Sequence, residues 1–533
     1  MPQHNLFRLK LLVFLAVLLA GAWFYSPGSW NAAARYDSIY ALAEEGTFAI
    51  DTYITNPKKN VNTGDWSRHD GHYYSSKAPG NMFIGAAAYA PFYWGGRMLG
   101  VKHNVHLDLF YGWWINFWCS AVPLALGALC MLLLLLDWGF SPVRSTFWAL
   151  CFALATPLFP YCTQLWGHPM AAAFLAVAFY ASWKAKPSHV LAGFAVGWAV
   201  LADYAAAFAL PALALPLLRA KDWRGTLKTA LGGVLPLALF LWYHWVCFGS
   251  PVTIGNAYAN PVFLQSEGAG GMMTRFSTLT FWKLLFGTQR GLIWNAPLLI
   301  LAFPGAAALW RRNRWLAAGL AFTILAGCLS NSAYGYWDSG ASVTARFLIY
   351  SLPAWIIFAA HWQTRTAPRQ ILALLLALWS FLNMFTVANI SPTISTKRYS
   401  PLLPDAYWMC YRDGAWNRAR SRGLKLYYWQ KETKKISREA ALSPGRLLFG
   451  HTPWSDIILF SGVAALLYFT LLRRELNAAA RLKQWGREVR EILQRNRHHL
   501  RSPWLYVTAA GALLLIIFPG ASPWGILQHN LVV

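Results

Sequence analysis

The sequence predicts an all-α protein that crosses a membrane many times, and three observations lead to this fold class. Hydrophobic residues make up 57% of the 533 residues and charged residues only 12%, which is too apolar for a soluble globular domain. The apolar residues gather in runs long enough to span a bilayer as helices. Short clusters of Lys and Arg separate these runs, as expected for the cytoplasmic loops of a polytopic membrane protein.

The net charge and the cysteines narrow the possible partners. A net charge of +26 would indicate nucleic-acid binding in a soluble protein, but here the basic residues follow the positive-inside pattern, so no nucleic-acid partner is expected. The 7 cysteines show neither a disulfide framework nor a CxxC metal site, because almost all lie in or beside apolar runs.

The first span covers residues 7–25, behind Arg8 and Lys10, and we expect its N-terminus in the cytoplasm. The alternative is a cleaved signal peptide, since the small residues at 20–22 form an acceptable cleavage site. Either reading places residues 26–108 in a long outer loop.

Two surface helices are expected in this first outer loop. Tyr36, Ile39 and Tyr40 recur at helical spacing, which predicts an amphipathic helix over about 33–45. The apolar, aromatic run 79–94 predicts a second helix. We expect that helix to lie in or dip into the outer leaflet, because a crossing there would place the later basic loops on the wrong side.

With the first span, the apolar runs predict about thirteen transmembrane helices. The module 1–388, with outer loops 26–108 and 248–291, should contain the active site. Residues 389–453 should form a small outer cap, and 454–533 a transmembrane pair with a basic cytoplasmic loop. The twelve later spans are 109–136, 145–161, 169–183, 190–203, 205–218, 228–247, 292–310, 315–330, 347–361, 369–388, 454–472 and 504–519.

The stretch 65–80, DWSRHDGHYYSSKAPG, packs two acids, two histidines and a lysine between apolar segments long enough to span a membrane. A carboxylate there could take a proton from an attacking hydroxyl, while Lys77 and His72 could hold a phosphate. The alternative is a solvated loop that leads into the next helix. His69, His72 and Asp70 could also hold a metal, but hydrogen-bonded loop residues are the commoner explanation, so we expect no metal and no other cofactor.

Three further polar residues lie at or near membrane depth on the same predicted outer face. They are His168, Asp203 and Asp338. Function is the default hypothesis for an ionisable group such as Asp203 inside an apolar segment. The alternative is a water-exposed break between two short helices.

Several outer segments match motifs of a known superfamily. Lys77-Ala78-Pro79 loosely matches a Lys-Pro-Pro element, and 248–251 (FGSP), 287–297 (GTQRGLIWNAP) and 334–347 (YGYWDSGASVTARF) match outer-loop segments. With the order of spans and loops, the chain resembles the GT-C membrane glycosyltransferases. It is most similar to the lipid-carrier-dependent branch, which includes lipid A aminoarabinose transferase and the protein O-mannosyltransferases. The resemblance implies surface helices in the first and fourth outer loops.

The resemblance also implies roles for individual residues. Lys77 would bind the phosphate of a lipid carrier, with Arg290 and Arg346 as further phosphate partners. Arg35 and Tyr36 match an Arg-Tyr pair, but Ala32 and Ala33 stand where the family has an acidic pair that includes its presumed base. With that pair absent, four acids compete to be the base, with Asp65 and Asp37 ahead of Asp51 and Asp70.

The expected function is transfer of a sugar from a polyprenyl-phosphate carrier to a hydroxyl of a surface glycan, lipid or protein. The expected partners are therefore the lipid-linked sugar, a hydroxyl acceptor in the cell envelope, and membrane lipids. The resemblance implies the inner membrane of a bacterium, with a periplasmic active face. The alternatives are a transporter or flippase of a lipid-linked sugar, and a non-catalytic subunit that binds polyprenyl phosphate.

Overall fold

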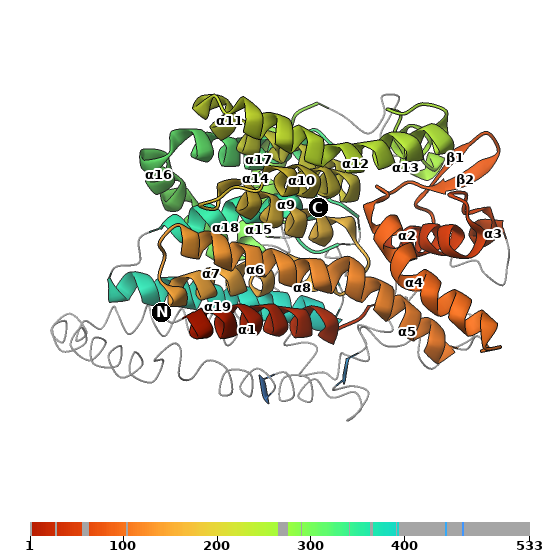
Figure 1. Ribbon diagram of the computed structural model, residues 1–533, viewed down its shortest axis with the longest axis horizontal. Coiled ribbons are helices and arrows are strands. Elements are labelled where there is room, and N and C mark those ends of the chain that lie inside the picture. The colour runs from red at the N-terminus through yellow and green to blue at the C-terminus, as the bar shows by residue number, and fades with distance from the viewer. Residues whose placement is uncertain are drawn as a thin grey trace, which may run out of the picture.

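A computed structural model gives the architecture. It describes residues 3–26, 29–55, 63–102, 105–264, 275–288, 290–340, 342–362, 366–390, 392–393, 443–444 and 461–462. Most of these residues are helical, as the sequence predicts, and the long helices lie alongside one another in a bundle (Figure 1). The predicted cap 389–453 and the C-terminal pair 454–533 lie almost entirely outside the described residues.

The segment between the first two long helices folds at one end of the bundle (Figure 1, right). The side chain of Ser29 caps the first short helix by accepting a hydrogen bond from the Ala32 N–H. Gly46, in the left-handed conformation with φ 68°, ends the π-helical turn that follows. Helix α1 (Gln3–Trp23) precedes this segment and α4 (Gly80–Met98) follows it. Between them lie α2 (Trp30–Tyr40), η1 (Ala41–Glu45), α3 (Asp51–Thr55), β1 (Trp66–His69) and β2 (His72–Ser75).

Strands β1 and β2 form an antiparallel hairpin, which the all-α prediction missed. Asp70 and Gly71 form its two-residue turn, and both have positive φ, 48° and 85°, as a type I′ turn requires. The hairpin is anchored to the bundle, because the Ser67 hydroxyl donates to the Gly255 carbonyl at 2.7 Å and the Tyr243 hydroxyl to the Ser75 carbonyl at 3.3 Å.

The next elements form the centre of the bundle. The predicted span 145–161 is broken into two helices, whereas the helices from Val105 to Asp137 run on without a break. These elements are α5 (Val105–Asn116), η2 (Phe117–Ala121), α6 (Val122–Asp137), α7 (Pro142–Leu154), α8 (Leu158–Cys162), α9 (Gly167–Trp183), α10 (His189–Ala202), η3 (Tyr204–Ala209), α11 (Leu210–Ala220) and α12 (Trp223–Phe248).

The remaining elements complete the bundle, and the predicted span 292–310 is again broken into short pieces. They are η4 (Gly255–Tyr258), α13 (Pro261–Leu264), α14 (Thr278–Phe286), α15 (Leu292–Asn295), η6 (Pro297–Leu301), α16 (Ala302–Arg312), α17 (Arg314–Ser332), η7 (Arg346–Ser351), α18 (Leu352–His361) and α19 (Ala367–Ile390).

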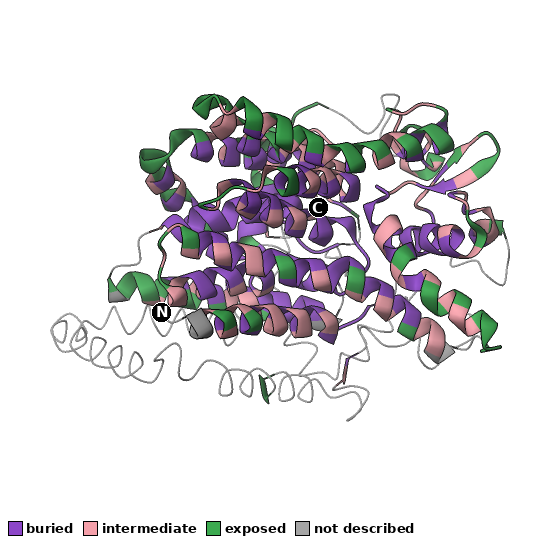
Figure 2. Ribbon diagram, in the orientation of Figure 1, coloured by how far each residue is buried: buried purple, intermediate pink, exposed green. Residues whose placement is uncertain are grey.

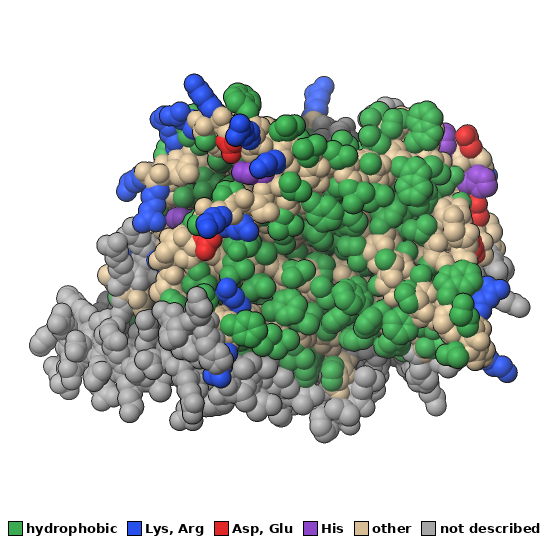
Figure 3. All heavy atoms as spheres, viewed as in Figure 1, with side chains coloured by type: hydrophobic (Ala, Val, Ile, Leu, Met, Phe, Trp, Pro, Cys, Tyr) green, Lys and Arg blue, Asp and Glu red, His purple; other side chains and the backbone are tan. Residues whose placement is uncertain are grey.

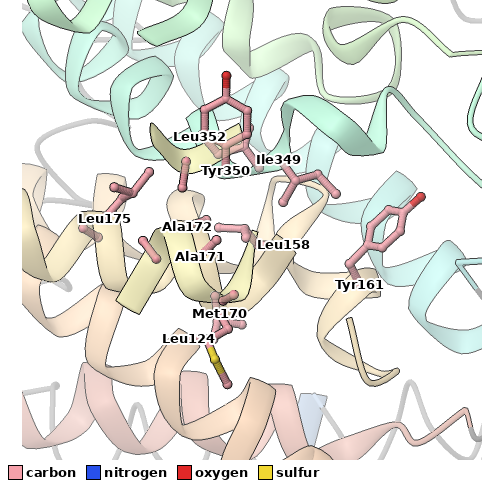
Figure 4. Close-up of a cluster of buried hydrophobic side chains, with 14 of the residues drawn as sticks. Leu124, Leu158, Tyr161, Met170, Ala171, Ala172, Leu175, Ile349, Tyr350 and Leu352 are labelled. Carbon is pink, nitrogen blue, oxygen red and sulfur yellow. The ribbon is translucent and has the colours of Figure 1, made fainter. Parts of the chain in front are cut away.

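The core lies where α6, α8 and α9 meet η7 and α18. Leu124, Leu158, Met170 and Ile349 converge there from different helices (Figure 4). Buried residues fill the middle of the bundle, while α11 and α12 expose their outer faces (Figure 2). Such exposed apolar side chains are stable only against lipid or another protein.

Among the described residues, 5 helices are long and apolar enough to cross a membrane. The chain is therefore an integral membrane protein. Apolar side chains cover the middle of the face drawn in Figure 3, and most of the Lys and Arg side chains on that face lie at the end with α11 and α16. The hairpin lies at the opposite end, so the bundle has one basic end and one end that carries the first loop.

Candidate active site

The hairpin brings Asp65 and Lys77 together. The two residues flank its strands, and Ser76 closes the hairpin base by donating from both its N–H and its hydroxyl to the Asp65 carbonyl, at 3.1 and 2.9 Å. Across this closure, the Lys77 Nζ lies 3.0 Å from Asp65 Oδ1. The pair is largely buried, with side-chain exposures of 20% and 13%.

Arg35 joins the first loop to the bundle. Its Nε donates to Asn31 on the same helix at 3.2 Å, and its Nη1 donates to the Ala78 carbonyl at 3.1 Å and to Asn81 Oδ1 at 3.3 Å. The Asn81 amide in turn donates to the Trp166 carbonyl at 3.3 Å. The buried guanidinium thus lies between α2, the start of α4 and the segment before α9.

His168 and Asp203 form a second pair at the same end of the bundle. Helices α9 and α10 are antiparallel neighbours joined through Lys184, so the start of α9 and the end of α10 lie side by side. There, His168 Nδ1 lies 2.6 Å from Asp203 Oδ2. Sequence reasoning singled out both residues but could not pair them.

Two glycines allow this convergence. A Cβ on Gly167 would collide with the Ala202 carbonyl oxygen, and a Cβ on Gly80 would lie 2.7 Å from the Ala202 nitrogen. Such contacts are too close for a larger residue. Without side chains at these two positions, the Lys77 segment and the start of α9 both pack against the residue that precedes Asp203.

Two arginines approach from the second half of the chain. The Arg346 guanidinium stacks over Trp166 at 4.7 Å and over Phe347 at 4.9 Å. Arg290 donates from Nη2 to the Gly340 carbonyl. Among the described residues, the buried Arg346 Nε and Arg290 Nη1 have no hydrogen-bond partner. Buried donors without a partner are costly, so these two point to a missing acceptor.

The charges interact with one another. Burial lowers the pKa of the Lys77 ammonium, Asp65 raises it, and the positive charges of Arg346 and Arg35 lower it further. Burial also lowers the pKa of Arg346, which Tyr161 and Asp65 oppose. These shifts in pKa show that the charges lie close enough to act on one another. We refer to the set as the charged cluster: Arg35, Asp65, Lys77, His168, Asp203, Arg290 and Arg346.

Within the charged cluster, three arginines and Lys77 face two carboxylates, so an anion would balance its charge. Asp338 lies at the edge, where its carboxylate raises the pKa of both Arg290 and Arg346 and accepts from the Gly340 N–H at 3.2 Å.

Three of the sequence-predicted residues lie on the hairpin or beside it and have no contact with the charged cluster in the part of the chain that the structure describes. Asp51 accepts from the Tyr73 N–H at 2.7 Å and lies 2.7 Å from His72 Nδ1. Asp70 occupies the hairpin turn, with its side chain 86% exposed and 3.4 Å from His69. Over the described ranges, no group of three or more His, Cys, Asp or Glu side chains could hold a metal ion.

Asp37 lies on the other side of α2 from Arg35, because two residues turn a helix by about 200°. Its side chain is fully buried, and neither carboxylate oxygen has a hydrogen-bond partner among the described residues. Burial raises the pKa of Asp37 well above its usual value, which favours the neutral carboxyl. It has no contact with Lys77.

The fold and the site together define a polytopic membrane protein with an anion-attracting cluster at one end of its bundle. No family model matches the sequence, and no curated protein matches it. Among solved structures, the fold is similar to ArnT from Cupriavidus metallidurans bound to undecaprenyl phosphate. That comparison has a TM-score of 0.46 and 14% identity over 73% of this chain, which spans 65% of that one. The apo state of the same protein gives 0.44 and 17%, over 70% and 62% of the two chains.

Proposed function

We propose that this protein is a membrane glycosyltransferase that moves a sugar from a polyprenyl-phosphate carrier to a hydroxyl of a surface glycan, lipid or protein. We place its active face on the periplasmic side of a bacterial inner membrane. The observation that carries the proposal is the convergence of four cations from separate segments at one end of an apolar bundle. Two of them have buried donors with no partner in the part of the chain that the structure describes.

The chemistry needs this arrangement. Breaking the bond between the sugar and the phosphate turns a phosphodiester with one negative charge into a monoester with up to two. Lys77 and Arg346 would meet that growing charge where burial strengthens each contact. A carrier with a long apolar chain also requires the phosphate site to lie beside lipid. The charged cluster meets this requirement, because it lies at one end of helices that are long and apolar enough to cross a membrane.

The acceptor hydroxyl needs a base as well. Of the four acids predicted for that role, Asp65 alone contacts a member of the charged cluster among the described residues. On sequence grounds alone, Asp65 and Asp37 rank ahead of Asp51 and Asp70 for this role.

The first experiment measures binding and cleavage with the purified protein in lipid nanodiscs. Binding of undecaprenyl phosphate is followed by thermal shift, and turnover by release of undecaprenyl phosphate from a panel of undecaprenyl-phosphate-linked hexoses and aminopentoses with envelope lipids as acceptors. Arg346→Gln should weaken binding by about tenfold or more, the scale of a lost charge-assisted hydrogen bond.

Lys283→Gln is the matched control, since Lys283 is an exposed cation that stacks on Trp337 at 5.6 Å outside the charged cluster. We expect it to bind as the native protein does. Failure of the native protein to bind undecaprenyl phosphate would refute the proposal. Binding without cleavage of any donor would favour a flippase or a binding subunit instead.

A further inference from the structure

We infer that His168, held in place by Asp203, is the general base that takes the proton from the acceptor hydroxyl. This inference rests on the proposed function and assigns the step that the missing acidic pair leaves open. Asp203 then acts as a positioning residue, and Asp65 serves the phosphate site.

The hydrogen bonds of the pair leave one imidazole nitrogen available. Asp203 Oδ2 lies 2.6 Å from His168 Nδ1, and its Oδ1 accepts from the Ala205 N–H at 3.2 Å. An ionised carboxylate can only accept, so the proton of the neutral ring is on Nδ1. Nε2 therefore carries a lone pair, and it has no hydrogen-bond partner among the described residues. A base must be in this state before it can take a proton.

The charge on Asp203 is secured by its surroundings. Its Oδ2 is hydrogen-bonded to the His168 ring and its Oδ1 accepts from the Ala205 N–H, while the Arg35 guanidinium adds a positive charge nearby. All three groups favour the ionised carboxylate. It can fix the tautomer of His168 and stabilise the imidazolium that forms when the ring takes a proton.

Aromatic packing fixes the orientation of the ring. Trp166 stacks on His168 with ring centroids 5.8 Å apart and an interplanar angle of 24°, and Phe347 meets it edge-on at 5.9 Å. His168 is only 7% exposed. Because Trp166 and Phe347 pack against the ring and Asp203 is hydrogen-bonded to it, Nε2 points in a fixed direction, as a positioned base requires.

The same tryptophan joins the base to the phosphate site. One face of Trp166 carries the Arg346 guanidinium at 4.7 Å, and its carbonyl accepts from the Asn81 amide that also binds Arg35. His168 thus lies close to Arg346, one of the cations that would hold the donor phosphate. The anomeric carbon of the donor is bonded directly to a phosphate oxygen. The base for the hydroxyl that attacks this carbon must therefore lie close to the phosphate site.

Asp65 is less suited to the role. Its Oδ1 lies 3.0 Å from Lys77 Nζ, so this oxygen is already engaged by the ammonium. Its contact with Lys77 fits a different task, which is to keep the ammonium aimed at the phosphate before the donor arrives.

The step balances as follows. The acceptor oxygen forms a bond to the anomeric carbon, and its proton moves to His168 Nε2. The bond between that carbon and the phosphate oxygen breaks, and its electron pair stays on the oxygen, which leaves polyprenyl phosphate with one more negative charge. The imidazolium then returns its proton to water.

The test compares variants of His168, Asp203, His189 and Asp65 in the two assays with undecaprenyl phosphate and undecaprenyl-phosphate-linked sugars. His168→Asn keeps a side-chain N–H for Asp203 but removes the base, so turnover should fall about a hundredfold or more with binding within about twofold of native. Asp203→Asn should lower turnover by about tenfold or more at unchanged binding, and Asp203→Glu should restore part of it.

The control is a second His–Asp pair at the other end of α10, where His189 Nε2 lies 3.5 Å from Asp222 Oδ2. His189→Asn should leave turnover unchanged. As an independent readout, added imidazole should restore part of the turnover of His168→Gly, because a free base can occupy the vacated space; absence of rescue in a folded His168→Gly would count against the inference.

The outcomes separate this inference from the proposed function. Near-native turnover in a folded His168→Asn would overturn the inference alone, and a large loss in Asp65→Asn at the same time would assign the base to Asp65. A native protein that releases no undecaprenyl phosphate from any donor would overturn both.

Discussion

Lys77 Nζ lies 3.0 Å from Asp65 Oδ1, and this ion pair closes the hairpin at its base. Both side chains are mostly shielded from water, so the pair is less screened than a surface salt bridge. A carrier phosphate that binds Lys77 must therefore compete with, or share the ammonium with, a carboxylate that is already in place.

Lys77→Ala should weaken undecaprenyl-phosphate binding by about tenfold or more, because it removes a charge-assisted contact and leaves Asp65 unpaired. Lys77→Arg should restore part of the affinity, since the charge remains while the geometry of the ammonium is lost. Thermal shift with undecaprenyl phosphate measures both. Lys184→Ala, at the basic end of the bundle, serves as the control, and equal loss in that variant would show that the effect is not specific to Lys77.

Binding should also depend on pH through Lys77. Burial and the neighbouring arginines hold the pKa of Lys77 below its usual value, so the empty site loses this charge at lower pH than an ordinary lysine would. The charged form binds phosphate, and affinity should therefore fall as the pH rises through the lowered pKa.

The measurement is a binding series from about pH 7.5 upward, where the phosphate no longer titrates. Lys77→Arg should remove the fall, because a guanidinium stays charged over the whole series. A native protein whose affinity stays constant up to the range of an ordinary lysine would contradict this assignment of charge.

Composition and periodicity predicted the helical class, because long apolar runs leave a membrane chain few alternatives to helices. They also predicted the helix around Tyr36 and the helix that starts near Pro79. The hairpin was missed although its signal was present: Asp70-Gly71 between alternating residues is a strong hairpin pattern. The many polar residues in that stretch are also typical of a loop, which is what the sequence indicated there.

The pairings within the site could not be predicted from one sequence. His168 and Asp203 are 35 residues apart, and their contact depends on how α9 and α10 align. Arg35 and Asn81 are 46 residues apart and meet through the packing of α2 on α4. Such contacts depend on the close approach at glycines such as Gly167, which a linear pattern does not show.

Gly167→Ala should therefore disturb both stability and chemistry. The new methyl group would collide with the Ala202 carbonyl and lie 2.9 Å from Arg35 Nη2, which should cost about 1–3 kcal/mol. It would also move His168 away from Asp203. Turnover of the folded fraction should fall more than binding of undecaprenyl phosphate does.

Gly95→Ala is the matched control for that variant. A Cβ at Gly95 meets nothing within 4 Å, and alanine favours a helix by up to about 1 kcal/mol over glycine. Its Tm should stay the same or rise. If Gly167→Ala behaves in the same way, the close packing at Ala202 does not position the pair.

The last prediction concerns the side of the membrane on which the charged cluster lies. The hairpin and the charged cluster lie at the end of the bundle opposite Lys184 and Lys186, and the positive-inside rule places those lysines in the cytoplasm. In a cysteine-free variant, a cysteine at the exposed hairpin turn (Asp70→Cys) should react with a membrane-impermeant maleimide added from outside. A cysteine at the exposed loop between α9 and α10 (Lys186→Cys) should react only after the membrane is opened. The reverse pattern would put the cluster on the cytoplasmic face, where a lipid-linked sugar would meet different acceptors. Reaction of both cysteines from the same side would mean that α4 crosses the bilayer instead of lying at its surface.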